Sequence, residues 1–439
     1  MAKIIPFHGT RYDTTVVEEI KQVVAPPYDI IDTAGQNALY DRHPRNIIRL
    51  ELGLDESGDG PTHNRYTRAA STLRDWLKTG TLKRDAQPTL YYHTIEYTPP
   101  HAPPGSPTKT LKGFLSTVKL EALDSGRIYP HENTRSAAKT DRLNLLETCK
   151  ANLSPIWSLY SDPQGTVMGL LEREAKGKQA LIDFPDDVGF RQRLWAVTDP
   201  AVLGNIVDAM RSMPLFIADG HHRYETALNY QKLRGQQAGS RADLHAYDAV
   251  LMLLTALEDP GLTVLPTHRV TTTALPPYDR VRSLLNAAFD LQEFPFTPAT
   301  QAATRATFLE AMRTTGRTAP VFGLSLKGDS RFALLILKPA RRPSAAASPR
   351  TRLDVSLLQQ LVVTTLCPSQ EEQEAILYTK DDHEALDWVV KGTATGALLL
   401  NATKVNEVHA VATAGERMPH KSTYFFPKPL TGLVINVME

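Results

Sequence analysis

The stretch that most constrains this chain is residues 214–225, where an apolar run meets a cluster of polar and charged residues. The apolar part, residues 214–218, predicts a buried strand. Asp219-Gly220 ends that strand with residues typical of a tight turn, and a helical pattern begins at His221. The sequence therefore predicts a strand, a tight turn and a helix start, as in α/β or α+β proteins.

The first turn of this predicted helix carries His221, His222 and Arg223. Free backbone N–H groups and the positive end of the helix dipole point the same way, which favours an anion. Cationic side chains add charge-assisted hydrogen bonds to phosphate. A zinc site is disfavoured, because adjacent histidines diverge on a helix and no Cys or carboxylate lies at ligand spacing. We predict phosphate binding here; the alternative is a turn glycine with structural histidines.

Size and composition narrow the class of protein. The chain has 439 residues, so two or three subdomains are expected. Its net charge of +1 indicates no general polyanion surface, and no nucleic-acid partner is expected. Its two cysteines indicate a reducing compartment. No signal peptide and no run of ~20 apolar residues is evident, so we expect a cytoplasmic protein without a membrane partner; the oligomeric state stays open.

A second informative stretch surrounds Glu132, in a loop that leads into a helix running to about Lys150. A loop carboxylate next to a histidine is a reasonable general base, and the alternative is a solvated loop acid. Further candidate substrate contacts share this stretch, namely His131, Thr134, Lys139 and Arg142.

Two later stretches carry candidate ligands. His268 and Arg269 are expected just past a strand end, where ligand groups gather in α/β sheets; the alternative is a solvated turn. In the tail, Lys421 and Ser422 offer charge and hydroxyl donors to phosphate oxygens. The alternative for the tail is a clamp that packs the C-terminus onto the body.

Apolar patterning predicts most other elements. The following are expected: strands at 45–53, 90–97 and 112–120, the last two as a hairpin; helices at 66–77 and 278–289; and a mobile loop at 339–349.

Taken together, these stretches resemble an uncharacterised bacterial domain-of-unknown-function family (number 1015). The resemblance runs from Pro6-Phe7 and Ala25-Pro26-Pro27-Tyr28-Asp29 to Lys421-Ser422-Thr423-Tyr424. Through Asp-Gly-His-His-Arg that family is similar to the ParB/sulfiredoxin superfamily. The resemblance implies a ParB/sulfiredoxin-like mixed-sheet core with added α+β blocks. The implied divisions are 1–110, 111–275 with an insertion at about 163–210, and 276–439.

Members of that superfamily suggest different functions. Sulfiredoxin carries a Cys where this chain has His221, which disfavours a thiol reductase. ParB proteins place a nucleotide switch beside a DNA-reading helix-turn-helix, and no such reader is evident here. Free serine kinases carry Asp-Gly-His-His-Arg itself and an earlier Pro-His-Glu-like segment, which resembles Pro130-His131-Glu132.

The kinase resemblance implies a role for each matching residue. Glu132 would be the base, and Asp219 would lie beside the transferring phosphoryl group, with Mg²⁺. The nucleotide phosphates would be bound by His221, His222 and Arg223. Gly220 of the same turn, and Lys421 and Ser422 of the tail, are further candidate phosphate contacts on their own chemistry. ATP or ADP is the expected donor, and the acceptor a hydroxyl of a free metabolite such as serine. The alternative function is a ParB-type nucleotide-binding regulator without kinase turnover.

Overall fold

The computed structural model describes residues 2–100, 102, 105–132, 136–238 and 244–438. The chain forms two compact units. Unit 1 consists of the described residues within Met1–Pro130, Thr134–Thr263 and Pro427–Glu439; unit 2 consists of those within His131–Asn133 and Val264–Phe426.

Unit 1 is built on a nine-stranded sheet with the order β6-β11-β8-β12-β5-β4-β10-β9, to which β1 adds by pairing with β5. The β6–β11 and β8–β12 pairs are parallel and the other pairs are antiparallel. The predicted mixed sheet of an α/β protein is therefore confirmed. The strands of unit 1 are β1 Ile4–Ile5, β2 Thr10–Tyr12, β3 Leu82–Arg84, β4 Leu90–Tyr97, β5 Lys109–Lys119, β6 Ile128–Tyr129, β7 Ala151–Asn152, β8 Ile156–Tyr160, β9 Ile182–Pro185, β10 Arg191–Val197, β11 Leu215–Asp219, β12 Ala249–Ala256 and β21 Asn436–Val437.

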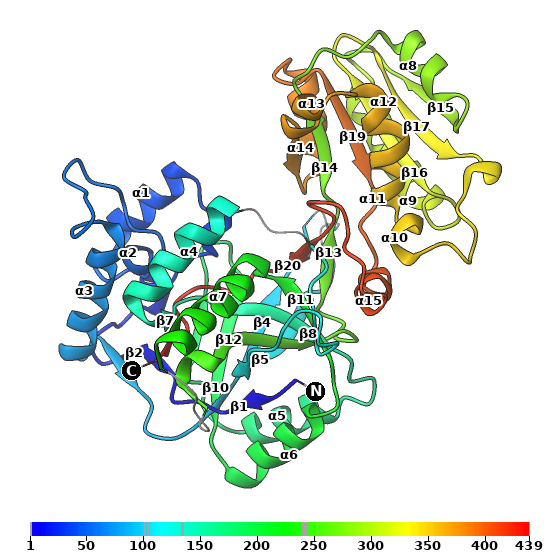
Figure 1. Cartoon of the computed structure of the whole chain (residues 1–439). Coiled ribbons are helices and arrows are strands. Elements are labelled where there is room, and N and C mark those ends of the chain that lie inside the picture. Colours follow the sequence, from blue (N-terminus) through cyan, green and yellow to red (C-terminus); the bar gives the residue numbers. More distant parts are fainter. Residues whose placement is uncertain (1, 101, 103–104, 133–135, 239–243, 439) are drawn as a thin grey trace. The chain divides into compact units, whose positions relative to one another are not determined.

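Several helices of unit 1 pack against one another. Helices α4 and α7 lie against each other, and α5 packs on α6 (Figure 1). Helix α6 begins where the side chain of Asp199 accepts hydrogen bonds from the first turn and Pro200 occupies the first turn. The helices are α1 Thr33–Arg42, α2 Ile48–Glu51, α3 Arg65–Lys78, α4 Ser136–Cys149, α5 Thr166–Ala175, α6 Pro200–Met210 and α7 His221–Ala238, with 3₁₀ turns η1 Ile20–Gln22, η2 Tyr28–Ile30 and η3 Ala246–Asp248.

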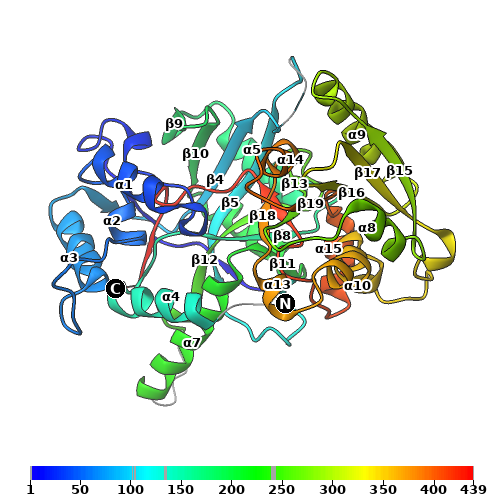
Figure 2. The same ribbon diagram turned by 90° about the horizontal axis from the view of Figure 1, so that it is seen from above.

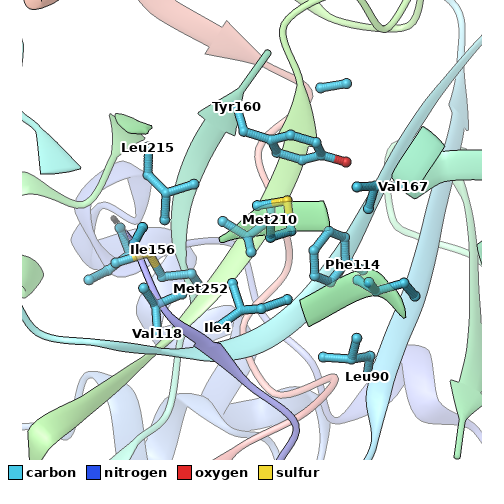
Figure 3. Packing of buried hydrophobic residues seen from close by; sticks show 14 of the residues in the cluster. Ile4, Leu90, Phe114, Val118, Ile156, Tyr160, Val167, Met210, Leu215 and Met252 are labelled. Carbon is cyan, nitrogen blue, oxygen red and sulfur yellow. The ribbon is translucent and has the colours of Figure 1, made fainter. Parts of the chain in front are cut away.

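The core of unit 1 joins one face of the sheet to these helices. Ile156, Leu215 and Met252 come from three neighbouring strands and are fully buried with Met210 of α6 (Figure 3). Tyr224 of α7 belongs to the same cluster. The helix that carries the His-His-Arg motif is thus fixed to the sheet by its own apolar face.

The hairpin of β4 and β5 forms as predicted. The predicted insertion at 163–210 contributes β10, which pairs with β4. The predicted strand at 45–53 is wrong, because residues Ile48–Glu51 form the short helix α2. Asn46 explains the difference: its Oδ1 accepts the Ile48 N–H and its amide donates to backbone carbonyls, which starts a helical turn.

Unit 2 is built on a six-stranded sheet with the order β15-β17-β16-β19-β14-β18. All of its neighbouring strands are antiparallel, and β15, β17 and β16 lie side by side in Figure 2. Helices α9 and α14 bury Phe308, Met312 and Leu386 against it. The strands are β13 Thr263–Leu265, β14 His268–Thr271, β15 Phe289–Pro295, β16 Val321–Leu326, β17 Arg331–Leu337, β18 Leu377–Thr379, β19 Gly396–Leu400 and β20 Tyr424–Phe426, of which β13 and β20 pair separately.

The helices of unit 2 are α8 Tyr278–Leu285, α9 Gln301–Thr315, α10 Pro349–Arg352, α11 Asp354–Leu358, α12 Thr364–Leu366, α13 Gln370–Glu374, α14 Asp382–Val390 and α15 Val405–Thr413, with the 3₁₀ turn η4 Pro339–Arg341 and the π turn η5 Gln359–Val363.

Two predicted elements of unit 2 differ in the structure. The helix expected at 278–289 ends at Leu285, and Phe289 opens strand β15. The predicted loop at 339–349 contains the turn η4 and the start of α10. The predicted divisions at 110 and 275 stay predictions, although strands from both sides of residue 110 share one sheet. Over the described part of the chain, we find no helix with the length and apolar character needed to cross a membrane.

Candidate functional site

The strand, turn and helix predicted around Asp219 are confirmed. Asp219 is the last residue of β11, and α7 begins at His221. The pairing of β11 with β8 shifts register between Ile217 and Asp219, which turns the strand end out of the regular ladder. Gly220, which lies between Asp219 and His221, has φ +93°, a left-handed conformation that favours glycine.

Asp219 is a buried carboxylate held by two cations. Its Oδ2 accepts a hydrogen bond from Arg223 Nη2 at 2.6 Å, and its Oδ1 accepts one from Lys428 Nζ. The side chains of all three residues are only 10% exposed. Burial alone would raise the pKa of Asp219, but the charges of Lys428 and Arg223 lower it to about 2. Asp219 is therefore ionised at neutral pH.

Arg223 has one donor without an acceptor among the described residues. Its Nη1 donates to the Pro155 carbonyl and its Nη2 to Asp219, but its buried Nε has no hydrogen-bond partner in this part of the chain. A Cβ added to Gly220 would lie 2.9 Å from this Nε. The guanidinium thus packs on the bare Cα of the glycine at the start of α7.

Unit 1 contains a second cluster of buried charges, formed by Arg142 and Glu51. Arg142 Nη1 contacts Glu51 Oε1 at 3.2 Å, and Ser154 donates to the same oxygen at 3.0 Å. The Arg142 guanidinium also stacks 4.1 Å from the ring centre of Tyr28. Glu51, Arg142, Ser154 and Arg223 line a cavity of about 50 Å³, which is room for a few water molecules.

Two residues of α4 that are predicted to contact substrate form ion pairs within unit 1. Arg142 is 6% exposed and forms ion pairs with Glu51 and Asp141. Lys139 Nζ lies 3.0 Å from Glu225 Oε2 of α7. Both side chains therefore connect α4 to its neighbours. Thr134 lies outside the described residues.

Glu132 belongs to unit 2, where the tail segment surrounds it. Its Oε1 accepts a hydrogen bond from the Lys421 backbone N–H at 3.0 Å and lies 3.1 Å from His420 Nδ1. Arg417 donates to its backbone carbonyl at 3.3 Å. Lys421 makes this possible through a left-handed backbone, with φ +54°. The carboxylate is thus oriented by groups from the tail.

His131, next to Glu132, and Ser422 of the tail have structural partners in unit 2. His131 is 2% exposed, and its Nε2 lies 3.0 Å from Thr423 Oγ1. Ser422 is 4% exposed and donates to the Pro419 carbonyl. The site roles predicted for Lys421 and Ser422 stay predictions.

His268 and Arg269 were predicted to lie just past a strand end, with a solvated turn as the alternative. They lie instead in strand β14, and both are buried, so the solvated turn is wrong. The ring of His268 accepts the Leu400 N–H at 3.3 Å. Arg269 donates to the Lys421 carbonyl at 3.1 Å and stacks on Tyr378. Burial lowers the pKa of Arg269 to about 10. The substrate contacts predicted for His268 and Arg269 stay predictions.

The residues do not form a protein-held metal cage. Both oxygens of Asp219 are already bonded to cations. Within the described ranges, no group of three or more His, Cys, Asp or Glu side chains is arranged to hold a metal ion.

Sequence reasoning missed Lys428 and Glu51. Lys428 lies between Pro427 and Pro429 in the tail, and this stiff setting was the one local signal that its side chain is fixed. Glu51 was missed because residues 45–53 were predicted to form a strand.

Comparison with known proteins identifies the family. A family described as "Protein of unknown function (DUF1015)" matches residues 4–356. The chain belongs to this family. No curated protein matches the chain.

Several solved structures are similar to this family member. A conserved hypothetical protein from Pyrococcus furiosus is 14% identical, with a TM-score of 0.34; the match covers 71% of this chain and 92% of that one. A free serine kinase in complex with AMP is 14% identical, with a TM-score of 0.36 and coverage of 77% and 96%. SbnI from Staphylococcus aureus, with a C-terminal truncation, is 11% identical, with a TM-score of 0.36 and coverage of 74% and 87%.

Proposed function

We propose that this chain is a nucleotide-dependent small-molecule kinase that phosphorylates a hydroxyl of a free metabolite such as serine. One observation carries the proposal: the ionised Asp219 and the unpartnered Nε of Arg223 lie together at the start of α7. Donors at a helix start, with a guanidinium beside them, suit the phosphates of a nucleotide. The Asp-Gly-His-His-Arg resemblance supports ATP or ADP as the donor.

Glu132 is the proposed base. Its Oε1 is bonded to the Lys421 N–H and His420, and these bonds fix the orientation of the carboxylate. An oriented carboxylate can accept the proton of an alcohol as the alcohol attacks. The base role itself comes from the resemblance of Pro130-His131-Glu132 to the kinase segment.

The reaction is a phosphoryl transfer. The substrate hydroxyl oxygen bonds to the terminal phosphorus, the bond from phosphorus to the bridging oxygen breaks, and the hydroxyl proton passes to Glu132. The nucleotide leaves with one phosphate fewer. Such a reaction depends on positioning and charge stabilisation more than on covalent chemistry of the protein, and Arg223 supplies a fixed cation for this purpose. Mg²⁺ would enter held mainly by the nucleotide phosphates.

The experiment that tests this function incubates the purified protein with a metabolite pool and phosphate-labelled ATP or ADP. Mass spectrometry then identifies any new phosphomonoester. We expect one phosphorylated hydroxyl compound to accumulate. Nucleotide binding without transfer to serine or to any other alcohol would contradict the kinase and favour the regulator.

A further inference from the structure

The carboxylate of Asp219 is paired with two cations. Arg223 and Lys428 both bond to it, and the three side chains are each 10% exposed. They lie at the start of α7, where the helix dipole adds positive potential. The carboxylates of Asp29 and Glu51 act on Arg223 as well. An anion that reached this place would meet two cations and a helix start.

The segment after Pro427 places Lys428 in unit 1. Thr431 exchanges backbone hydrogen bonds with Ala25, at 3.2 and 2.8 Å. Ile435 pairs with Thr10, and β21 pairs with β7. Gly432 allows the chain to turn close against Ile47 with φ +93°. Lys428 thus rests on a segment fixed by backbone pairing.

The two cations on Asp219 differ in how they can move. Arg223 is held by the Pro155 carbonyl as well as by Asp219, and its fork is planar and rigid. Lys428 is a point charge on a flexible four-carbon stem. If the ammonium of Lys428 turns to an incoming anion, Arg223 still neutralises Asp219. The exchange therefore leaves no buried charge unpaired.

We infer that Lys428 is a phosphate-binding lysine. Its ammonium moves away from Asp219 and contacts the outer phosphates of a nucleoside di- or triphosphate. The Nε of Arg223 has no hydrogen-bond acceptor among the described residues, and a phosphate oxygen at this place would supply one. This inference rests on the proposed function and adds to it a residue outside the segment that matches the family, which ends at residue 356.

Calorimetric titration of the full chain with adenosine, AMP, ADP and ATP tests the inference. We compare the wild type with Lys428→Gln, Lys428→Arg and the exposed control Lys176→Gln. Loss of a charged hydrogen bond predicts about ten- to hundredfold weaker binding of ADP and ATP to Lys428→Gln. Adenosine affinity should not change, and Lys428→Arg should stay within a few fold of the wild type for ADP. Lys176→Gln should match the wild type.

The possible failures are distinguishable. A wild type that binds none of these nucleotides overturns the proposed function and the inference together. Equal ADP affinity for the wild type and Lys428→Gln overturns the inference alone. Equal losses for adenosine and ADP in both Lys428 variants, with a lowered thermal midpoint, would show that the lysine supports the fold, and this also overturns the inference.

Discussion

At the scale of single residues, the charge state of Asp219 is decided by its neighbours. Burial opposes its ionisation, but Lys428 and Arg223 more than offset burial. The folded-state pKa of about 2 lies below the ordinary value of 3.8. The ionised form therefore stabilises the fold above about pH 4, and this stabilisation is lost as the pH falls towards 2.

Asp219→Asn should remove this stabilisation. At pH 7 it leaves Arg223 and Lys428 without their carboxylate, and loss of one partner of a buried pair costs about 3–5 kcal/mol. The difference from the wild type should be largest above pH 5 and shrink between pH 4 and pH 2. Urea unfolding across this range measures it.

The exposed pair of Asp208 and Arg211 offers the control. Asp208→Asn should change the free energy of unfolding by less than about 0.5 kcal/mol. A destabilisation by Asp219→Asn that is equally large at pH 7 and pH 2 would contradict the account of its ionisation.

At the scale of elements, α7 depends on the conformation of one glycine. Gly220 is left-handed, and a Cβ there would meet Arg223 Nε. Gly235 lies in the same helix, where an added Cβ would meet nothing within 4 Å. The same change of Gly to Ala should thus have opposite effects at the two positions.

Gly220→Ala should lower the free energy of unfolding by about 1–3 kcal/mol, because it strains the backbone and displaces Arg223. Gly235→Ala should raise it by about 0.5–1 kcal/mol, because Ala is the better helix former. Chemical unfolding of both variants provides the comparison. A neutral Gly220→Ala would show that the left-handed turn is not required.

Elements with a clear period or punctuation were predictable from the sequence. The run before Asp219-Gly220 and the β4–β5 hairpin are examples. The stretch at 45–53 was not, because Ile47, Ile48 and Leu50 are all buried and a fully buried segment has no distinguishing period. The hydrogen bonds of Asn46, one local to Ile48 and one long-range to Gln22, support a helical turn there.

At the scale of the whole molecule, the chain's last segment completes unit 1. Ile435 is fully buried and pairs with Thr10. Ile435→Ala should therefore cost about 2–5 kcal/mol of unfolding free energy, and Ile435→Val about 0.5–1.5 kcal/mol. Thermal or urea unfolding measures both. Near-wild-type stability of Ile435→Ala would mean that the segment is not part of this core.

The packing of the C-terminal segment on distant parts of unit 1 explains which contact of the site could not be predicted from the sequence. Asp219 and Lys428 are 209 residues apart, and no local pattern in either stretch specifies their contact. The motif itself was predictable, because strand, turn and cations are adjacent in sequence. The contact with Lys428 depends on the pairing of the C-terminal segment with β2 and β7.

The central claim is that this chain transfers a phosphoryl group from a nucleotide to an alcohol. Phosphorus NMR of the protein with stoichiometric ADP or ATP and the alcohol acceptor identified from the metabolite pool tests it most directly. We predict that the terminal-phosphate signal of the nucleotide is lost while the signals of the shortened nucleotide and of the acceptor's phosphomonoester appear, and that Glu132→Gln slows the transfer by about 10²–10⁴-fold. The absence of a signal from the phosphorylated acceptor, or an unchanged rate in Glu132→Gln, would contradict the account.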